Sequence, residues 1–458
     1  MFMMYALAAV TGQWGKPGTG AGIRFGTSRG RIPLGGFPGP QNPVTKKITP
    51  MLWTDAARNP GQSEWGDGEV NALRHGIKFI MNFSSNCLIN QHMDVNKTKK
   101  LLRDRSKIEF ICAIDNFMVP SVLYADIVLP GATNWEQNDL FTTWGTGDSV
   151  LFANKAVDPP GEAKTTYEML SLLADKLGFK EAFTQGKSEE DWLRTMWKNT
   201  GEPISYEELK KRGICIFNLD KPPLVGGQKI REQGSIDPQR EDLRFNTKES
   251  GDIKRTGKIE LYSRALVHEY ENRGAGQINR DDDGDPIVYP IPMYFPEPEN
   301  AKNSATGEFP FVVLTPHTRY STHSTHVNNP YLRELNKFDV RGNPAYDGRC
   351  FGVDPLQPRF DGDGLTEVWI NTEDAKSRGI DHRDRVKVYN RLGAVIASAK
   401  VTQRVMPGVL VIYQGSWYDP DETGVDHGGC TNVLTTEQPS RIDHGNAQMI
   451  ACATIQKV

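Results

Sequence analysis

The sequence predicts an α/β protein, in which a parallel-sheet α/β domain is followed by a C-terminal β-barrel. Two observations lead to this fold class. Between residues 77 and 177, short apolar runs alternate with helical patterns, as in strands joined by helices in a parallel sheet. From Phe309 onward, strand-like runs follow one another between Gly and Pro residues, which indicates a small barrel. With 458 residues, the chain is long enough for two or three domains.

The first predicted element is a helix in the N-terminal run MFMMYALAAV, which ends at Thr11-Gly12. The run has the length of a secretory signal, but it lacks a basic n-region and is too short to span a bilayer. No capping residue precedes its apolar start, so we expect a piece of a longer protein. The glycine-rich segment 12–22 is predicted to be a loop or a tight connection between domains, because its glycines allow positive φ and close backbone approach. It does not fit the GxGxxG dinucleotide pattern, and no strand leads into it.

In the α/β domain the predicted strands cover 77–81, 108–114 and 126–130, and the predicted helices cover 95–103, 121–124 and 165–177. Ligands of such sheets bind at the carboxyl ends of the strands. The residues expected on this binding edge are Asn82, Asn86, Asn90, Gln91, Asp115 and Phe117. Asp115 either accepts hydrogen bonds from the edge of a guanine or caps the next turn. Asp126, before the third strand, leaves the same choice open.

The middle of the chain gives weaker signals. A helix is predicted around 192–197 and a short strand at 257–263, GKIELYS. The acidic run DDDGD at 281–285 is predicted to be a solvated loop, because no Glu follows at the twelfth position of an EF-hand. We therefore divide the chain into a remnant of a preceding α/β domain with an irregular connection (1–68), an α/β dinucleotide-binding domain (69–250), a linker (251–308) and the barrel domain (309–458).

The barrel is predicted from its strands and from one hairpin. The strands lie at 311–314, 366–370, 385–390, 394–401 and 409–413, with a short helix at 372–379. The turn Arg391-Leu392-Gly393 joins two of these strands in a plausible hairpin.

Two polar loops of the barrel region hold most of the candidate binding residues. They are 315–329, TPHTRYSTHSTHVNN, and 415–435, GSWYDPDETGVDHGGCTNVLT. Guanidinium and hydroxyl groups suit the oxygens of a phosphate or a pterin, so we expect the loops to form one wall of a pocket for a large anionic cofactor. The alternatives are a polar loop that satisfies its own turns and, for Trp417-Tyr418, aromatic rings at a domain seam. The candidates are His317, Arg319, His323, Ser324, Thr325, Trp417, Tyr418, Asn432 and Thr435.

Composition and motifs exclude several classes of function. The net charge of -3, without a long basic run, argues against a general nucleic-acid binder. No two of the six cysteines lie within three residues of each other, so no CxxC, zinc or iron–sulfur ligand set is present. The three histidines of loop 315–329 lack a nearby Cys or carboxylate and make a poor zinc site. GxSxG, P-loop and HExxH motifs are absent, so no catalytic residue or metal ligand is assigned.

Several segments, taken in order, resemble the dimethyl sulfoxide reductase branch of the molybdopterin oxidoreductase superfamily. The likeness runs from MFMMYALAAVTG to Val458. Its segments are NCLINQH, YADIVLPGATNWEQND, HTRYSTHST, VWINTEDAKSRGI, DRVKVYNRLG, VMPGVL, GSWYDPD and GGCTNVLTT. The chain departs from the superfamily at Thr166-Tyr167, where many members carry Asp-Trp.

The resemblance implies a bis(molybdopterin guanine dinucleotide) cofactor with one molybdenum, and a six-stranded, double-psi-type barrel that binds it. Position by position, it implies dinucleotide contacts from Asn86, Cys87, Asn90, Gln91 and Asp115. The implied pterin or phosphate contacts are Arg319, His323, Ser324, Thr325, Trp417, Tyr418, Asn432 and Asn446.

The resemblance also implies an activity and partners. The expected reaction is the reduction of a small S-oxide or N-oxide by oxygen-atom transfer in anaerobic respiration. Electrons would come from an iron–sulfur subunit and a membrane anchor subunit, and the protein would be exported folded to the periplasmic side of the membrane. Members are longer, and their N-terminal half carries the [4Fe-4S] cysteines, the serine ligand of molybdenum and a twin-arginine signal.

This chain shows none of these features, so we expect a C-terminal portion that is inactive alone. The alternatives are a selenate or other oxyanion reductase, a half-subunit that works with a separate N-terminal half, and a non-catalytic fragment.

Overall fold

The computed structural model describes residues 2–16, 46–64, 68–142, 149–217, 258–264, 290–293, 307–329, 365–439 and 450–458, with a few isolated positions between them. The chain forms two compact units, and each combines separate stretches of sequence. One unit holds 1–45 with 131–295, and the other holds 46–130 with 296–458. The segment 69–250 is thus divided between the units after residue 130, and the four domain boundaries stay a prediction.

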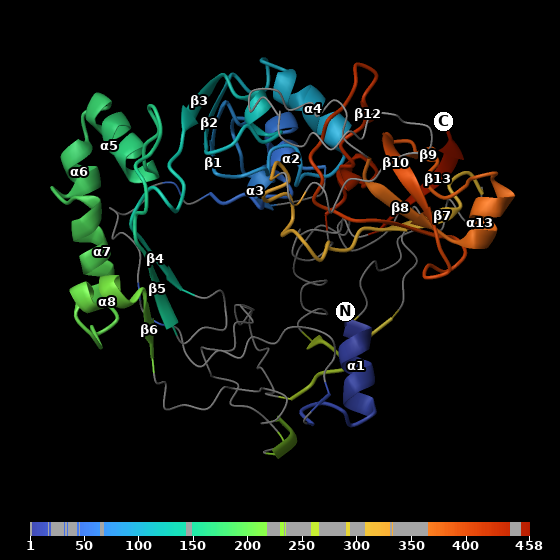
Figure 1. Ribbon diagram of the computed structural model, residues 1–458, viewed down its shortest axis with the longest axis horizontal. Coiled ribbons are helices and arrows are strands. Elements are labelled where there is room, and N and C mark those ends of the chain that lie inside the picture. The colour runs from blue at the N-terminus through green and yellow to red at the C-terminus, as the bar shows by residue number, and fades with distance from the viewer. Residues whose placement is uncertain are drawn as a thin grey trace. The chain divides into compact units, whose positions relative to one another are not determined.

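The second unit begins with a parallel sheet that confirms the predicted α/β class (Figure 1). Its strands lie in the order β1 (Phe79–Phe83), β2 (Phe110–Asp115) and β3 (Ile127–Pro130), within two residues of the predicted starts. Helix α4 (Val95–Arg103) joins β1 to β2 and has the predicted bounds. It begins at Asp94, whose carboxylate accepts a hydrogen bond from the Lys97 backbone N–H (3.2 Å), and its buried positions repeat at helical spacing.

The barrel is closed by six strands, as predicted. The order β10-β8-β11-β7-β13-β9 returns to its start because β9 also pairs with β10 in an antiparallel hairpin. Buried residues alternate along β9, and all positions of β10 from 394 to 399 are buried, as in a small barrel filled by its own side chains. The strands are β7 (Phe311–Leu314), β8 (Glu367–Ile370), β9 (Arg385–Tyr389), β10 (Ala394–Val401), β11 (Val409–Ile412) and β13 (Ile450–Lys457).

One apolar core joins the parallel sheet to the barrel. Leu102 and Ile111 belong to the same buried cluster as Val368 and Leu410. Burial of this surface fixes the loop after β1 beside the loops of the barrel. Smaller elements complete the unit, and they are α2 (Trp53–Arg58), α3 (Gly68–Asn71), η1 (Val122–Tyr124), α13 (Thr372–Ser377), β12 (Val425–Asp426) and η2 (Thr431–Val433).

The first unit contains α1 (Phe2–Val10) and an antiparallel sheet of β4 (Asp139–Thr142), β5 (Ser149–Ala153) and β6 (Ile214–Ile216). The sheet was not predicted, whereas α1 ends at Thr11-Gly12 as expected. In the part of this unit that the structure describes, the sheet is accompanied by the helices α5 (Thr166–Lys176), α6 (Lys180–Thr184), α7 (Glu189–Lys198) and α8 (Tyr206–Arg212). Of these, α5 and α7 confirm the helices predicted from sequence.

One predicted element of this unit is wrong. Residues 258–263 form bends and coil and do not form the strand expected from GKIELYS. No strand among the described residues pairs with them, and a strand requires a partner for its backbone hydrogen bonds. The acidic run at 281–285 lies outside the described residues.

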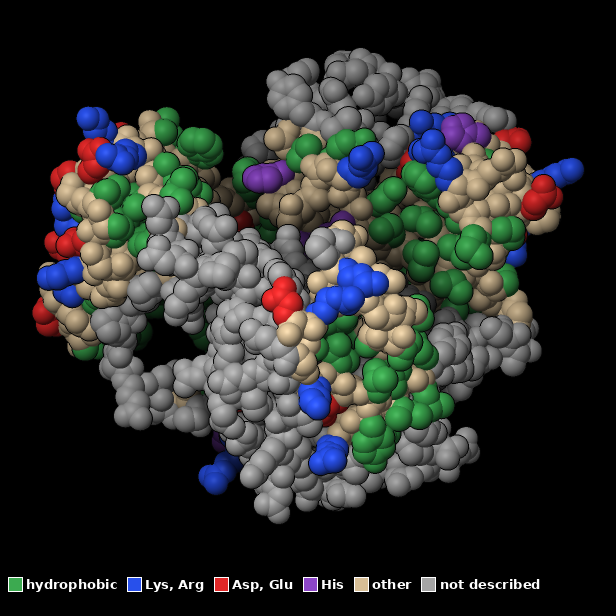
Figure 2. Space-filling view, turned by 90° about the horizontal axis from the view of Figure 1, so that it is seen from below, with side chains coloured by type: hydrophobic (Ala, Val, Ile, Leu, Met, Phe, Trp, Pro, Cys, Tyr) green, Lys and Arg blue, Asp and Glu red, His purple; other side chains and the backbone are tan. Residues whose placement is uncertain are grey.

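The described surface carries charges of both signs. Figure 2 shows basic and acidic side chains interspersed with hydrophobic ones, in keeping with the small net charge of -3. No helix among the described residues combines the length and the apolar character needed to cross a membrane.

Candidate cofactor-binding site

Three loops of the second unit meet where they leave the carboxyl ends of their strands. They follow β1 (84–94), β7 (315–329) and β11 (413–435). The second and third loops are joined where the Gln414 backbone N–H donates to the carbonyl of Pro316 (3.0 Å). At Gly415 (φ 114°) a Cβ atom would overlap the carbonyl oxygen of His323, so the two backbones are in direct contact. The two loops predicted to form one wall therefore lie together.

Asn90 ties the first loop to the third. Its side chain is buried, and its amide nitrogen donates to the Ser416 carbonyl (2.9 Å) while its amide oxygen accepts from the Tyr418 backbone N–H (2.7 Å). The Asn90 carbonyl accepts a further bond from the Asn432 side chain (2.8 Å). Both ends of the Asn90 amide are thus engaged by the third loop, which gives Asn90 a positioning role.

Asn86 ties the first loop to the second. Its amide oxygen accepts from the backbone N–H and the hydroxyl of Ser121 (3.0 and 2.9 Å), and its amide nitrogen donates to the Ser324 hydroxyl (3.3 Å). The Ser324 carbonyl in turn accepts from the indole N–H of Trp417 (2.9 Å). The three loops therefore form one hydrogen-bonded structure.

Trp417 and Tyr418 do not provide the exposed ring surface suggested by the sequence. Their exposed fractions are 7% and 4%, and the Tyr418 hydroxyl donates to the Asn96 side chain (2.7 Å). Burial raises the pKa of Tyr418. Both rings are interior groups that fix the third loop against its neighbours.

The side chains that remain open to solvent are hydrogen-bond donors. Arg319, His323 and Thr325 are exposed, and Arg319 forms no ion pair with a described residue. The backbone at His323 is left-handed (φ 51°). Together these groups offer positive charge and N–H and O–H donors, which suits an anionic ligand.

Gln414 orients two of these side chains and was missed from the sequence. Its amide nitrogen lies 2.9 Å from His317 Nδ1, and its amide oxygen lies 3.3 Å from His323 Nδ1. The two imidazole rings meet edge to face, with centroids 4.6 Å apart. The signal available in the sequence was the position of Gln414, directly after a strand and before a glycine of the third loop.

The two aspartates of the sheet have structural partners. Asp115 is buried and accepts from the Asn116 and Phe117 backbone N–H groups (2.8 and 3.2 Å), which is the capping alternative. Burial raises the pKa of Asp115, and these hydrogen bonds oppose the shift. The carboxylate of Asp126 pairs with both terminal nitrogens of Arg105 (2.6 and 2.9 Å) and accepts from the Ile111 backbone N–H. A ligand contact from either aspartate stays a prediction.

The other predicted residues lie within or beside the same loops. The Cys87 thiol lies 3.4 Å from the Asn82 side chain, and the exposed Gln91 contributes its backbone N–H to the Asn86 carbonyl (3.1 Å). The hydroxyl of Thr435 donates to the side chain of Asn432 (3.1 Å) and orients it. Phe117, after β2, is 44% exposed. Asn446 lies outside the described residues.

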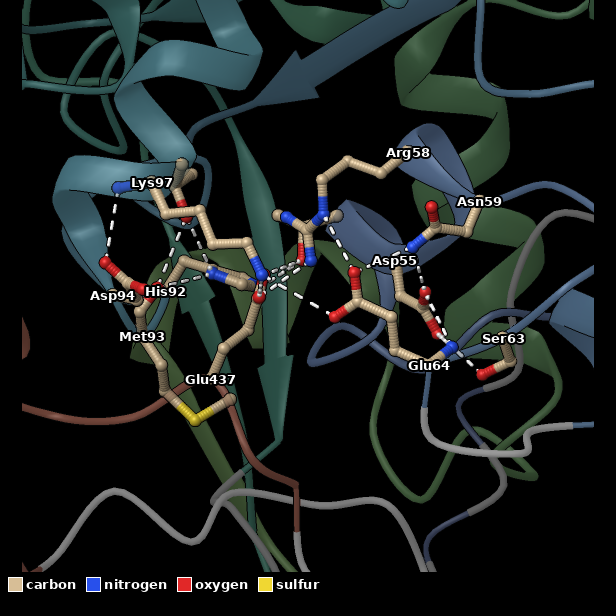
Figure 3. A network of polar contacts seen from close by, with 12 residues as sticks. Asp55, Arg58, Asn59, Ser63, Glu64, His92, Met93, Asp94, Lys97 and Glu437 are labelled. Atoms are coloured by element: carbon tan, nitrogen blue, oxygen red, sulfur yellow. Dashed lines mark hydrogen bonds and ion pairs between the residues drawn. The ribbon is translucent and has the colours of Figure 1, made fainter.

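A buried ionic network anchors the end of the third loop (Figure 3). Glu437, whose side chain is 5% exposed, accepts from Arg58 (2.6 Å), Lys97 (2.7 Å) and the Thr54 hydroxyl (2.6 Å). Burial alone would raise the pKa of Glu437, but these partners outweigh it and the pKa lies below its usual range. Sequence reasoning did not find this network, because its members are far apart along the chain.

The donor set of the site favours an anion over a metal. Among the described residues, no group of three His, Cys, Asp or Glu is placed to hold a metal ion. The exposed side chains of the second loop instead present a guanidinium, imidazoles and hydroxyls. These residues fit the phosphate and heterocycle oxygens of a dinucleotide cofactor.

Comparisons with known proteins match the chain in two regions. A family model described as molybdopterin oxidoreductase matches residues 1–176, and one described as molydopterin dinucleotide binding domain matches residues 357–451. Dimethyl sulfoxide reductase DmsA of Escherichia coli (strain K12) is 34% identical over 99% of this chain and 50% of its own length. Trimethylamine-N-oxide reductase of Haemophilus influenzae is 26% identical over 100% of this chain and 52% of its own length.

A solved structure shares the fold. Acetylene hydratase from Pelobacter acetylenicus matches with a TM-score of 0.58 and 17% identity, over 89% of this chain and 46% of its own. The chain spans about half the length of the curated relatives it matches.

Proposed function

The chain belongs to the molybdopterin oxidoreductase family, and on this premise we propose that it is the cofactor-binding portion of a molybdenum enzyme that reduces S-oxides or N-oxides by oxygen-atom transfer. One observation carries the proposal at the level of the structure. Three loops, each at the carboxyl end of a strand, are hydrogen-bonded into one wall with exposed cationic and neutral donors. The matched dinucleotide-binding region contains the third loop of this wall.

We propose that the ligand is bis(molybdopterin guanine dinucleotide). When bound, this group would supply a molybdenum centre for two-electron oxygen-atom transfer, in which the substrate loses one oxygen, and two electrons and two protons convert that oxygen to water. Arg319 would pair with phosphate oxygens, and Ser324, Thr325 and the imidazole of His323 would donate to phosphate or pterin oxygens. Asn86 and Asn90 would hold the loops in register, which fixes the orientation of these donors.

The test of cofactor binding is a content measurement. The chain is expressed in a host that makes the molybdenum cofactor, purified, and assayed for molybdenum and released guanine nucleotide per chain. We expect both in the wild-type chain and a reduced content in Arg319→Ala. Arg404→Ala is the matched control, because Arg404 is exposed on the turn before β11 and should leave the content unchanged. A folded wild-type chain that retains neither molybdenum nor guanine nucleotide would refute the proposal.

Activity is proposed to require more of the protein than this chain. We propose that a separate or preceding N-terminal half completes the enzyme and that electrons arrive from an iron–sulfur subunit and a membrane anchor subunit on the periplasmic side. The cofactor-loaded chain should then show no sulfoxide or N-oxide reduction with reduced benzyl viologen. Turnover of dimethyl sulfoxide by the purified chain alone would contradict this. The completed enzyme should also be assayed with selenate as the substrate. Reduction of selenate in place of dimethyl sulfoxide would favour the alternative of an oxyanion reductase.

A further inference from the structure

Gln414 lies between two exposed imidazoles of the candidate site and contacts both of them. Its amide nitrogen lies 2.9 Å from His317 Nδ1 and 3.1 Å from His323 Nδ1. Its amide oxygen is farther from His323 Nδ1, at 3.3 Å. The backbone of Gln414 is fixed as well, because its N–H donates to the Pro316 carbonyl and the residue forms a bridge with His317. One side chain is therefore placed to decide where both rings carry their protons.

The contacts of Gln414 favour one tautomer in both rings. An amide nitrogen carries two hydrogens and can only donate, so each Nδ1 that it contacts must accept. A neutral imidazole that accepts at Nδ1 carries its proton on Nε2, and an imidazolium could not accept at all. Among the described residues, neither ring forms an ion pair with a carboxylate, in contrast to His427, which lies 3.3 Å from Asp421. Both rings are therefore neutral, with the proton on Nε2.

The Nε2–H groups of the two rings are open to a ligand. Neither His317 Nε2 nor His323 Nε2 has a hydrogen-bond partner among the described residues. Both side chains are exposed, and the rings are in contact, with their centroids 4.6 Å apart. Because each Nδ1 faces Gln414, the two Nε2–H groups are directed away from it. Two neighbouring N–H donors suit a group with several oxygen acceptors, such as a phosphate.

The opposite orientation of the Gln414 amide would have the opposite chemical result. With its oxygen toward both Nδ1 atoms, each ring would carry its proton on Nδ1, and each Nε2 would be an acceptor able to bind a metal ion. In the described part of the chain, no group of three His, Cys, Asp or Glu is placed for such an ion. Arg319 and Thr325, exposed on the same loop as the histidines, present further donors. The donor form is the one that agrees with this surrounding.

We propose that Gln414 is a positioning residue that holds His317 and His323 as a pair of neutral Nε2–H donors, and that this pair binds the oxygens of a diphosphate. The choice of a diphosphate rests on the proposed function, because a dinucleotide cofactor contains one. The tautomers do not rest on it, because Gln414 sets them without a ligand. Gln414 thus acts on the ligand through the two rings, and fixed donors lose less entropy on binding than mobile ones.

The tautomers are measured in the cofactor-free chain by long-range proton–nitrogen correlation NMR with isotope-labelled histidine at mildly alkaline pH. The chain has nine histidines, and the variants His317→Gln and His323→Gln identify the two signals. We expect a protonated Nε2 in both rings. His92 serves as the internal reference for the other tautomer, because its Nδ1 lies 3.0 Å from the Met93 carbonyl. A protonated Nδ1 in His317 or His323 would overturn the proposal.

Gln414→Glu separates the donor role from a merely structural one. The carboxylate has a similar size but can only accept, so the proton should move to Nδ1 in at least one of the two rings. Gln403→Glu is the matched control, because it adds the same charge at an exposed position on the turn before β11. The control should leave both tautomers unchanged. Unchanged tautomers in Gln414→Glu as well would show that Gln414 does not set them.

Pyrophosphate is the probe for the ligand, and its binding to the cofactor-free chain is followed by isothermal titration calorimetry. We expect saturable binding, about tenfold weaker in Gln414→Met, which keeps the length of the side chain but no longer orients the rings. Gln403→Met should bind as the wild type does. Equally tight binding to Gln414→Met, or no binding to the wild type at millimolar concentration, would overturn the assigned ligand.

Two further results have distinct meanings. Binding of Zn²⁺ that shifts the Nε2 signals of both rings would indicate the opposite amide orientation and would overturn the donor role. The tautomer and pyrophosphate measurements need no molybdenum. A chain that gives the expected results in both but retains no molybdenum would support the role of Gln414 and refute the proposed cofactor alone.

Discussion

At the scale of single residues, buried polar side chains hold the candidate site together. Asn90 bonds two points of the third loop through its amide, and Asn432 adds a third bond to its carbonyl. The sequence predicted Asn90 on the binding edge of the parallel sheet and Asn432 in a polar loop of the barrel region. Their role as bonds between loops depends on which segments the fold brings together, and no local pattern records that.

Replacement of Asn90 by Ala should destabilise the chain by about 2–4 kcal/mol. The Ser416 carbonyl and the Tyr418 N–H would both lose their partner in a buried place, and each such loss costs about 1–3 kcal/mol. Urea denaturation followed by circular dichroism measures the change. Asn154→Ala is the control, because Asn154 makes an exposed bond to the Lys210 carbonyl. Equal stability of the two variants would contradict the positioning role.

Glu437→Ala should cost about 3 kcal/mol or more, because it leaves Arg58 and Lys97 without their buried carboxylate. Since the folded-state pKa of Glu437 is lowered, its contribution is present at neutral pH and is lost as the pH falls below the usual carboxyl range. The difference in unfolding free energy between wild type and variant should therefore shrink in acid. Glu109→Ala removes an exposed pair with Lys78 and should change stability by less than about 1 kcal/mol. A constant difference across pH would argue against an ionic origin of the effect.

His92 gives the chain a second pH dependence, in a higher range. Burial lowers its pKa, and Nδ1 lies 3.0 Å from the Met93 carbonyl, so the neutral ring carries its proton on Nδ1. The unfolded chain takes up a proton below about pH 6.5 where the folded chain does not, so stability falls as the pH drops through this value. The urea midpoint should decline less steeply from neutral to mildly acidic pH in His92→Gln. If the urea midpoint depended on pH equally in wild type and variant, His92 would be excluded as the source of this pH dependence.

At the scale of elements, the contact between the second and third loops depends on Gly415. A side chain there would meet the His323 carbonyl and would also have to adopt a positive φ. Gly415→Ala should therefore lower molybdenum content and stability, the latter by more than the roughly 1 kcal/mol expected from φ alone. Gly408→Ala separates the two effects, because Gly408 has a positive φ of 79° and open space around it. Equal losses in both variants would show that the loop contact is unimportant.

Strong local periodicity made some elements predictable. Helix α4 has a capping aspartate and an apolar stripe, and β7 and β10 are apolar runs between turn residues, and all three have the predicted bounds. The strand expected at 257–263 shows the limit, since an apolar alternation without a partner does not form a sheet. The antiparallel sheet of the first unit was missed because its third strand, β6, lies more than 60 residues after β5 along the chain.

The candidate site was predictable in its residue types but not in its exposure. Arg319 and His323 are exposed, as a ligand site requires, whereas Trp417 and Tyr418 are buried and support the loop from inside. The sequence of an aromatic pair in a polar loop is the same whether the rings are exposed to a ligand or buried. Only the packed structure distinguishes the two cases. Gln414 was missed for a related reason, because its importance lies in the two imidazoles that it contacts.

At the scale of the whole molecule, binding of the proposed cofactor should stabilise the folded chain. A ligand that binds only the folded chain stabilises it by about 4 kcal/mol when present at a thousand times its dissociation constant. Chain purified from a host that makes the molybdenum cofactor should unfold at a higher temperature than chain from a host that does not. In Arg319→Ala the difference between the two preparations should narrow, as measured by scanning calorimetry. Identical unfolding temperatures for the two wild-type preparations would contradict the proposed linkage.

The pairing of β13 with both β7 and β9 has a consequence for biosynthesis. Until residues 450–457 have left the ribosome, the barrel is an open sheet with two unsatisfied edges. The barrel therefore cannot close until β13 has been synthesised. A ribosome stalled before β13 would carry an aggregation-prone intermediate with exposed strand edges. Chaperones that bind such edges should associate with it.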